Sequence, residues 1–119
     1  MSKTKLIQHD GNQIFKMNFA DSENEADVTS IINESINYIE TQPKKSVYAL
    51  TDMTNMFFNT NVSREFTSFL KKNKPYIKKS SVFGVSGLAR IVFNSVMKIS
   101  GRDVKIFKTE EEAVQFLVD

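Results

Sequence analysis

The chain has 119 residues, with 40% hydrophobic and 25% charged side chains and a net charge of +2. This length and composition predict a single domain over residues 1–119 that buries its core without a metal or a disulfide. The absence of cysteine excludes disulfides, thiolate metal sites and cysteine nucleophiles, and the single histidine excludes a site with several histidine ligands.

The first part of the chain predicts a β-hairpin and a helix. Residues 5–9 and 13–19 read as two strands joined at Asp10-Gly11, because this pair supports the positive φ angles of a tight turn. The helix that follows has apolar residues at helical spacing, and Pro43 marks its end. Its predicted buried residues are Val28, Ile31, Ile32, Ile36 and Ile39.

The middle of the chain predicts a buried strand, a loop and a second helix. Residues 47–50 form a continuous apolar run, and Asp52 follows the run closely. A loop then leads into a helix over about residues 62–74, with Thr60 or Asn61 as its N-cap. Its predicted buried residues are Val62, Phe66, Phe69 and Leu70.

The last part predicts two strands, at residues 81–85 and 104–107, each followed by a helix. The helix over residues 88–99 is closed by Gly101, which suits a left-handed C-terminal position, and Thr109 begins a capping box for the final helix. The predicted buried residues are Leu88, Ile91, Val92, Val96 and Ile99 in the first of these helices, and Ala113, Phe116 and Leu117 in the second.

The order of these elements is ββαβαβαβα, which predicts the α/β class. Strands that alternate with helices imply a mainly parallel sheet, and the N-terminal hairpin supplies an antiparallel edge. We therefore expect a single-layer, mostly parallel five-stranded sheet with about four helices.

Two stretches of the chain resemble a known family. Residues 48–61 run through an apolar strand, Asp52, a short loop and the pair Asn59-Thr60 before a helix, and residues 105–113 form a last strand and helix start. This pattern resembles the STAS domain and, more closely, the small SpoIIAA-like proteins. The resemblance implies a SpoIIAA-like fold and a non-catalytic regulatory module that binds a protein partner, as an anti-sigma factor antagonist does.

Thr60 is the candidate phosphorylation site. In the family a serine that follows an aspartate is phosphorylated, and the resemblance places this position at Thr60, with Asn59 instead of the aspartate. A phosphate at a helix N-terminus is favoured by the free backbone N–H groups and by the helix dipole, and it would repel an acidic partner. The alternative is that Thr60 acts only as an N-cap.

Apolar residues in the loop and in the third helix predict a contact surface. Adjacent Phe57 and Phe58 cannot easily face the same core, so we expect at least one residue of this loop to be exposed or to line a pocket. In the third helix a second row that contains Phe93 and Met97 widens the apolar arc. The predicted contact residues are Asp52, Met56, Phe57, Phe58, Asn59, Phe93 and Met97.

Two interpretations of this surface remain open. It is either a surface for a protein partner or a second copy of the chain, or the wall of a cavity for a small apolar ligand or lipid. The second interpretation follows from a resemblance of SpoIIAA-like topology to that of the CRAL-TRIO lipid carriers.

Charged residues add one candidate site and several exclusions. Ser86, Gly87 and Arg90 form a candidate anion site at a helix start, unless the glycines there serve only a tight turn. The five lysines within residues 71–79 read as a solvated helix face rather than a nucleic-acid surface, because stacking aromatics are few.

No second carboxylate or histidine is placed beside Asp52, so we expect no enzymatic activity, cofactor or metal. No apolar stretch reaches the length of a membrane span, and we expect a cytoplasmic protein.

Overall fold

The structure is a computed structural model that describes residues 3–102 and 104–119. Within these residues the chain forms five strands, four α-helices and one short 3-10 helix, η1. In chain order they are β1 (Thr4–His9), β2 (Asn12–Asn18), α1 (Glu25–Ile39), β3 (Val47–Asp52), α2 (Thr60–Asn73), η1 (Lys74–Tyr76), β4 (Ile77–Phe83), α3 (Leu88–Ser100), β5 (Lys105–Phe107) and α4 (Glu110–Val118).

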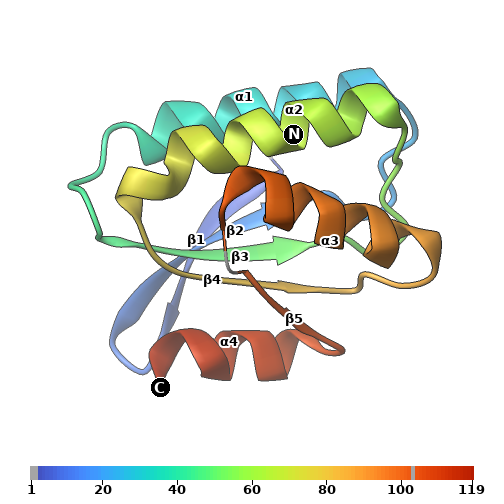
Figure 1. The fold of residues 1–119 in the computed structure, drawn as a ribbon. Helices are drawn as coiled ribbons and strands as arrows, with labels where there is room; N and C mark the ends of the chain where they lie inside the picture. Colours follow the sequence, from blue (N-terminus) through green and yellow to red (C-terminus); the bar gives the residue numbers. More distant parts are fainter. Residues whose placement is uncertain (1–2, 103) are drawn as a thin grey trace.

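The five strands form one sheet in the order β1-β2-β3-β4-β5 (Figure 1). β1 pairs antiparallel with β2, and the other three pairs are parallel. The hairpin turn is made by Asp10 and Gly11, whose φ angles of 50° and 78° fit the expected tight turn. The predicted α/β class, element order and mostly parallel sheet are therefore confirmed.

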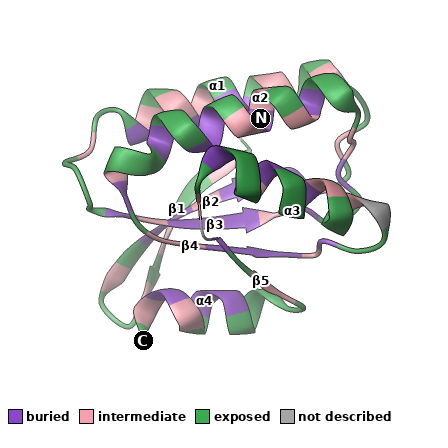
Figure 2. Cartoon of the chain, viewed as in Figure 1, coloured by how far each residue is buried: buried purple, intermediate pink, exposed green. Residues whose placement is uncertain are grey.

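Helices cover both faces of the sheet, but unequally. α1, α2 and α3 pack on one face, and α4 alone packs on the other (Figure 1). Because side chains alternate along a strand, Phe15 and Met17 of β2 join the larger core under the three helices, whereas Ile14 faces α4. The buried residues lie between the helices and the sheet (Figure 2). The smaller core contains Ile14, Leu50, Phe83, Ala113, Val114 and Leu117.

The predicted signals at helix ends hold for α3 and α4. Gly101 has a φ of 72° and closes α3, and the Thr109 hydroxyl accepts a hydrogen bond from the Glu112 N–H at 3.2 Å. β4 begins at Ile77, earlier than predicted, because the polar residues that follow it conceal the strand pattern. Among the described helices, none combines the length and the apolar character needed to cross a membrane.

Candidate functional site

The carboxyl ends of β2, β3 and β4 meet at one edge of the sheet, where three loops lead into α1, α2 and α3 (Figure 1). The register places Asn18 beside Asp52, and Asp52 beside Phe83. Ligands of open α/β sheets commonly bind at this edge. Because residues 52–60 contain most of the predicted contact residues, this edge and the helices that begin there form the candidate site.

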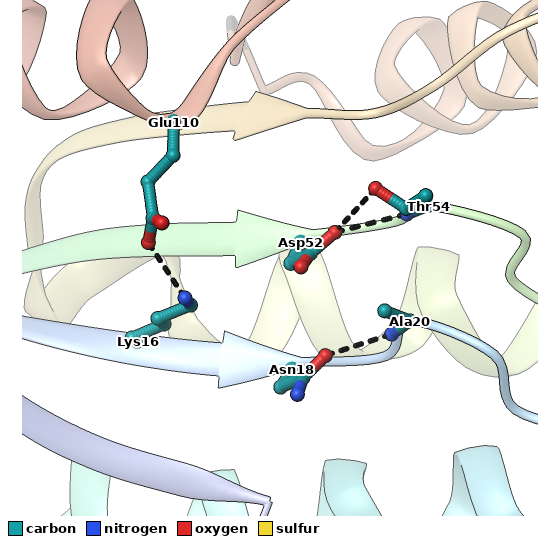
Figure 3. Close-up of polar contacts among 6 residues, drawn as sticks. All are labelled: Lys16, Asn18, Ala20, Asp52, Thr54 and Glu110. Carbon is teal, nitrogen blue, oxygen red and sulfur yellow. Dashed lines mark hydrogen bonds and ion pairs between the residues drawn. The ribbon is translucent and has the colours of Figure 1, made fainter.

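Asp52, the last residue of β3, organises the turn that follows the strand. Its Oδ1 accepts hydrogen bonds from the Thr54 N–H at 3.0 Å and from the Thr54 hydroxyl at 2.8 Å (Figure 3). Asn18 at the end of β2 does the same for the Ala20 N–H, at 2.9 Å (Figure 3). Both side chains therefore satisfy the backbone of the loop after their strand. A contact of Asp52 with a partner or ligand stays a prediction.

On the α4 side of the sheet, Lys16 and Glu110 form an ion pair with an Nζ–Oε2 distance of 2.6 Å (Figure 3). The Lys16 side chain is largely buried, and its Nζ also lies 5.8 Å from the centroid of the Phe83 ring. This pair holds the start of α4 against β2. Among the described residues, no group of three His, Cys, Asp or Glu side chains is arranged to hold a metal ion.

The loop after β3 packs against the larger core instead of projecting from it. Met53 and Met56 are buried, and Phe57 and Phe58 are half-buried. The Phe58 ring lies 6.4 Å from the ring of Phe66 in α2, centroid to centroid. None of the four loop residues is exposed, which corrects the part of the expectation that placed one of them on the surface. Two adjacent aromatic rings can both reach this core because the loop passes along its edge.

α2 begins at Thr60, and its N-cap is Asn59. The Asn59 Oδ1 accepts a hydrogen bond from the Val62 N–H at 2.9 Å. The predictions of Thr60 or Asn61 as the cap are therefore wrong, because the extended backbone that a cap requires occurs one residue earlier. Thr60 is instead the first helical residue, and it is exposed.

Glu25 in the first turn of α1 lies beside the start of α2. Its Oε1 accepts hydrogen bonds from the side-chain amides of Asn59 and Asn61, the latter at 3.3 Å. A negative charge is thus fixed next to both neighbours of Thr60. Sequence reasoning missed Glu25, because only the placement of α1 beside α2 in the fold brings these residues together.

The orientation of α3 differs from the prediction. Phe93 is 2% exposed and lies in the larger core, whereas Ile91 and Ile99 are 64% and 66% exposed. The prediction that Ile91 and Ile99 are buried is wrong, and Phe93 is not on the surface. Met97 is half-buried against the core. The side chain of Leu88, also predicted to be buried, lies outside what the structure describes.

The cavity wall proposed from sequence consists of Phe57, Phe58, Phe93 and Met97. None of five pronounced surface hollows in the described part of the chain is lined by any of these four residues. Phe93 instead fills the larger core. The apolar-carrier interpretation stays a prediction.

The turn between β4 and α3 packs closely on the loop after β3. Gly84 has a φ of 83°, and a Cβ there would lie 2.8 Å from the Thr54 backbone nitrogen. This close approach explains the first glycine of the turn. Ser86, Gly87 and Arg90 are exposed, and their role in anion binding stays a prediction.

The five clustered lysines do not share a helix face. Lys71 and Lys72 lie on α2, Lys74 lies in η1, and Lys78 and Lys79 lie on β4. The prediction of one solvated helix face is therefore wrong for the last three lysines, since α2 ends before them.

Comparisons with protein-family models, with curated proteins and with solved structures find no match for the chain. The structure shows an α/β fold with a five-stranded mixed sheet.

Proposed function

We propose that the chain is a non-catalytic regulatory module that binds a protein partner through the outer faces of α2 and α3, with Thr60 as a phosphorylation switch. The observation that carries this proposal is the exposure of Ile91 and Ile99 on α3. The resemblance to STAS and SpoIIAA-like proteins, in which such modules bind protein partners, supports it.

The outer face of α3 combines apolar and basic side chains. Ile91 and Ile99 are eight residues apart and lie on the same side of the helix, two turns from each other. Arg90 and Lys98 are also exposed, and α3 contains no Asp or Glu. Large apolar side chains exposed on a surface helix are typical of contact surfaces. This face suits a partner that offers apolar side chains among acidic ones.

The neighbouring face of α2 extends the positive charge. Arg64 and Lys71 are exposed there. The one carboxylate of α2, Glu65, is turned toward α1, where it accepts a hydrogen bond from the Thr29 hydroxyl at 2.8 Å. Because complementary charge speeds docking and selects partners, the two faces together favour an acidic partner.

The position of Thr60 supports a switch that weakens this docking. A phosphate there would add about two negative charges beside Glu25. These charges would repel the Glu25 carboxylate and an acidic partner alike, at the end of α2 that lies next to the start of α3. Phosphorylation would therefore release the partner.

Affinity capture from a lysate of the source cells tests the proposal. We expect the unmodified chain to retain a specific protein that the Ile91→Asp and Thr60→Glu variants lose. Leu6→Asp is the matched control, because Leu6 is also exposed, at 47%, but lies on the edge strand β1. If Leu6→Asp loses the same protein, or if Ile91→Asp keeps it, the contact surface is not on α3.

The switch is tested by adding ATP to the same lysate and by mass spectrometry of the recovered chain. We expect a phosphate on Thr60 that is absent from a Thr60→Val variant. A recovered chain that carries no phosphate at this position, in a lysate that phosphorylates other proteins, would contradict the switch.

A further inference from the structure

A basic hollow lies at the other end of the strands, opposite the candidate site. It has a volume of about 350 Å³, and its lining residues come from η1, the start of β4, the segment that follows α3, and α4. The residues that line it are Lys45, Lys74, Ile77, Lys78, Lys79, Ser80, Gly101, Arg102, Lys105 and Phe116.

Six of these ten residues are Lys or Arg, and none of the ten is Asp or Glu. They come from segments that are far apart in the sequence, since Lys45 precedes β3 and Lys105 begins β5. The fold therefore brings together cations from separate segments, and the run of lysines in residues 71–79 alone does not explain the cluster. Like charges in one hollow repel each other, and a bound anion would relieve this repulsion.

Arg102 forms the fixed centre of the hollow. Its half-buried guanidinium donates hydrogen bonds to the Leu70 carbonyl oxygen at 3.1 Å, to Ser80 Oγ at 2.8 Å and to Asn73 Oδ1. All three acceptors are neutral, so these bonds hold the guanidinium in place without cancelling its charge. Burial lowers the pKa of Arg102 from its ordinary value, but an arginine stays protonated in proteins.

The lysines at the rim differ in how firmly they are held. Lys79 Nζ donates to the carbonyl oxygens of Phe116 at 3.0 Å and of Asp119 at 3.1 Å. Within the described part of the chain, Lys74 Nζ makes a long contact of 3.5 Å with the Gly101 carbonyl oxygen. Lys78 is exposed, with its Nζ 5.5 Å from the centroid of a tyrosine ring. Of these three lysines, Lys74 and Lys78 are therefore less firmly held than Lys79 and better able to turn toward a ligand.

Favourable contacts with helix ends explain only part of this cluster. They account for Lys74 near the C-terminus of α2, for Arg102, which donates to a carbonyl oxygen in the last turn of α2, and for Lys79, which does the same at the end of α4. Lys78 lies on a strand and Lys45 in the loop before one. These two have no helix end to stabilise.

We propose that this hollow binds a phosphate-bearing anion, with Arg102 as the fixed contact and Lys74 and Lys78 closing from the rim. Guanidinium and ammonium groups together are the usual partners of phosphate oxygens. The proposal is independent of the protein-binding function proposed above.

Titration with inorganic pyrophosphate, followed by amide NMR, tests the proposal. We expect saturable shifts that are largest at the amides of Ser80 and Gly101. The Lys74→Gln, Lys78→Gln double variant should weaken binding about tenfold or more, because each charged hydrogen bond contributes substantially. Lys5→Gln, Lys108→Gln is the matched control, since both lysines are exposed and neither lines the hollow, and its affinity should change by less than about twofold.

Vesicles distinguish a free phosphate compound from a lipid headgroup. Phosphatidylcholine vesicles with and without phosphatidic acid are added in a second arm. Saturable pyrophosphate shifts without vesicle binding indicate a free ligand, and binding only to vesicles with phosphatidic acid, lost in the Lys74/Lys78 variant, indicates a lipid phosphate. The proposal is overturned if neither probe binds, if shifts spread over lysines outside the hollow, or if the control variant loses as much affinity.

Discussion

Gly84 allows the loops after β3 and β4 to touch. Its φ of 83° lies in the left-handed region, and a Cβ would approach both the hydroxyl and the backbone nitrogen of Thr54. Thr54 in turn is held by two hydrogen bonds to Asp52. The contact therefore joins the ends of two neighbouring strands at the candidate site.

Gly84→Ala should lower the free energy of unfolding more than Gly11→Ala. Both glycines have positive φ, so each substitution costs about 1–2 kcal/mol of backbone strain. Only Gly84 also meets backbone atoms of Thr54, whereas Gly11 has nothing within 4 Å of the added Cβ. Urea unfolding of the two variants measures the difference, and equal losses would contradict the close approach.

At the scale of the element, the start of α2 depends on Asn59. Asn59→Ala removes the cap of the Val62 N–H and the hydrogen bond to Glu25, and should destabilise the chain by about 1 kcal/mol. Thr60→Ala should change stability by only a few tenths of a kcal/mol, because Thr60 is an exposed residue after the cap. Thermal unfolding separates the two variants. A larger loss of stability for Thr60→Ala than for Asn59→Ala would indicate that Thr60 is the N-cap.

The orientation of α3 makes a second prediction at this scale. Phe93→Ala should cost about 3–5 kcal/mol, because it opens a cavity in the larger core. Ile91→Ala should cost less than about 0.5 kcal/mol, since its side chain is mostly in solvent. Urea unfolding of both variants checks the order. A larger loss of stability for Ile91→Ala than for Phe93→Ala would instead support the orientation predicted from the sequence, in which Ile91 is buried.

At the scale of the whole molecule, the sequence predicts the architecture better than the sites. The helical spacing in α1 and the alternation in β2 each leave one apolar face, so their buried sides follow directly. α3 carries two adjacent apolar rows, and spacing alone cannot choose between Ile91 and Phe93. The contact of Asp52 with Thr54 joins residues two apart and is local, whereas the contact of Glu25 with Asn59 joins residues 34 apart and depends on the tertiary fold, which no local pattern encodes.

The distribution of charge over the surface is also only partly predictable from the sequence. Residues 1–60 carry five Lys or Arg against eight Asp or Glu, and residues 61–119 carry eleven against six, which gives −3 and +5. The sequence thus predicts that charge is segregated. The fold divides the positive charge between two places, the outer faces of α2 and α3 and the hollow around Arg102.

Site-specific photo-crosslinking tests the central claim, that the outer faces of α2 and α3 bind a protein partner. A crosslinking residue is placed at position 91 on α3 or, as the control, at exposed position 111 on α4 across the sheet. In source cells we expect a crosslink to one protein from position 91 that disappears when Thr60 is replaced by glutamate, and none to that protein from position 111. No crosslink from position 91, or the same crosslink from both positions, would contradict the account.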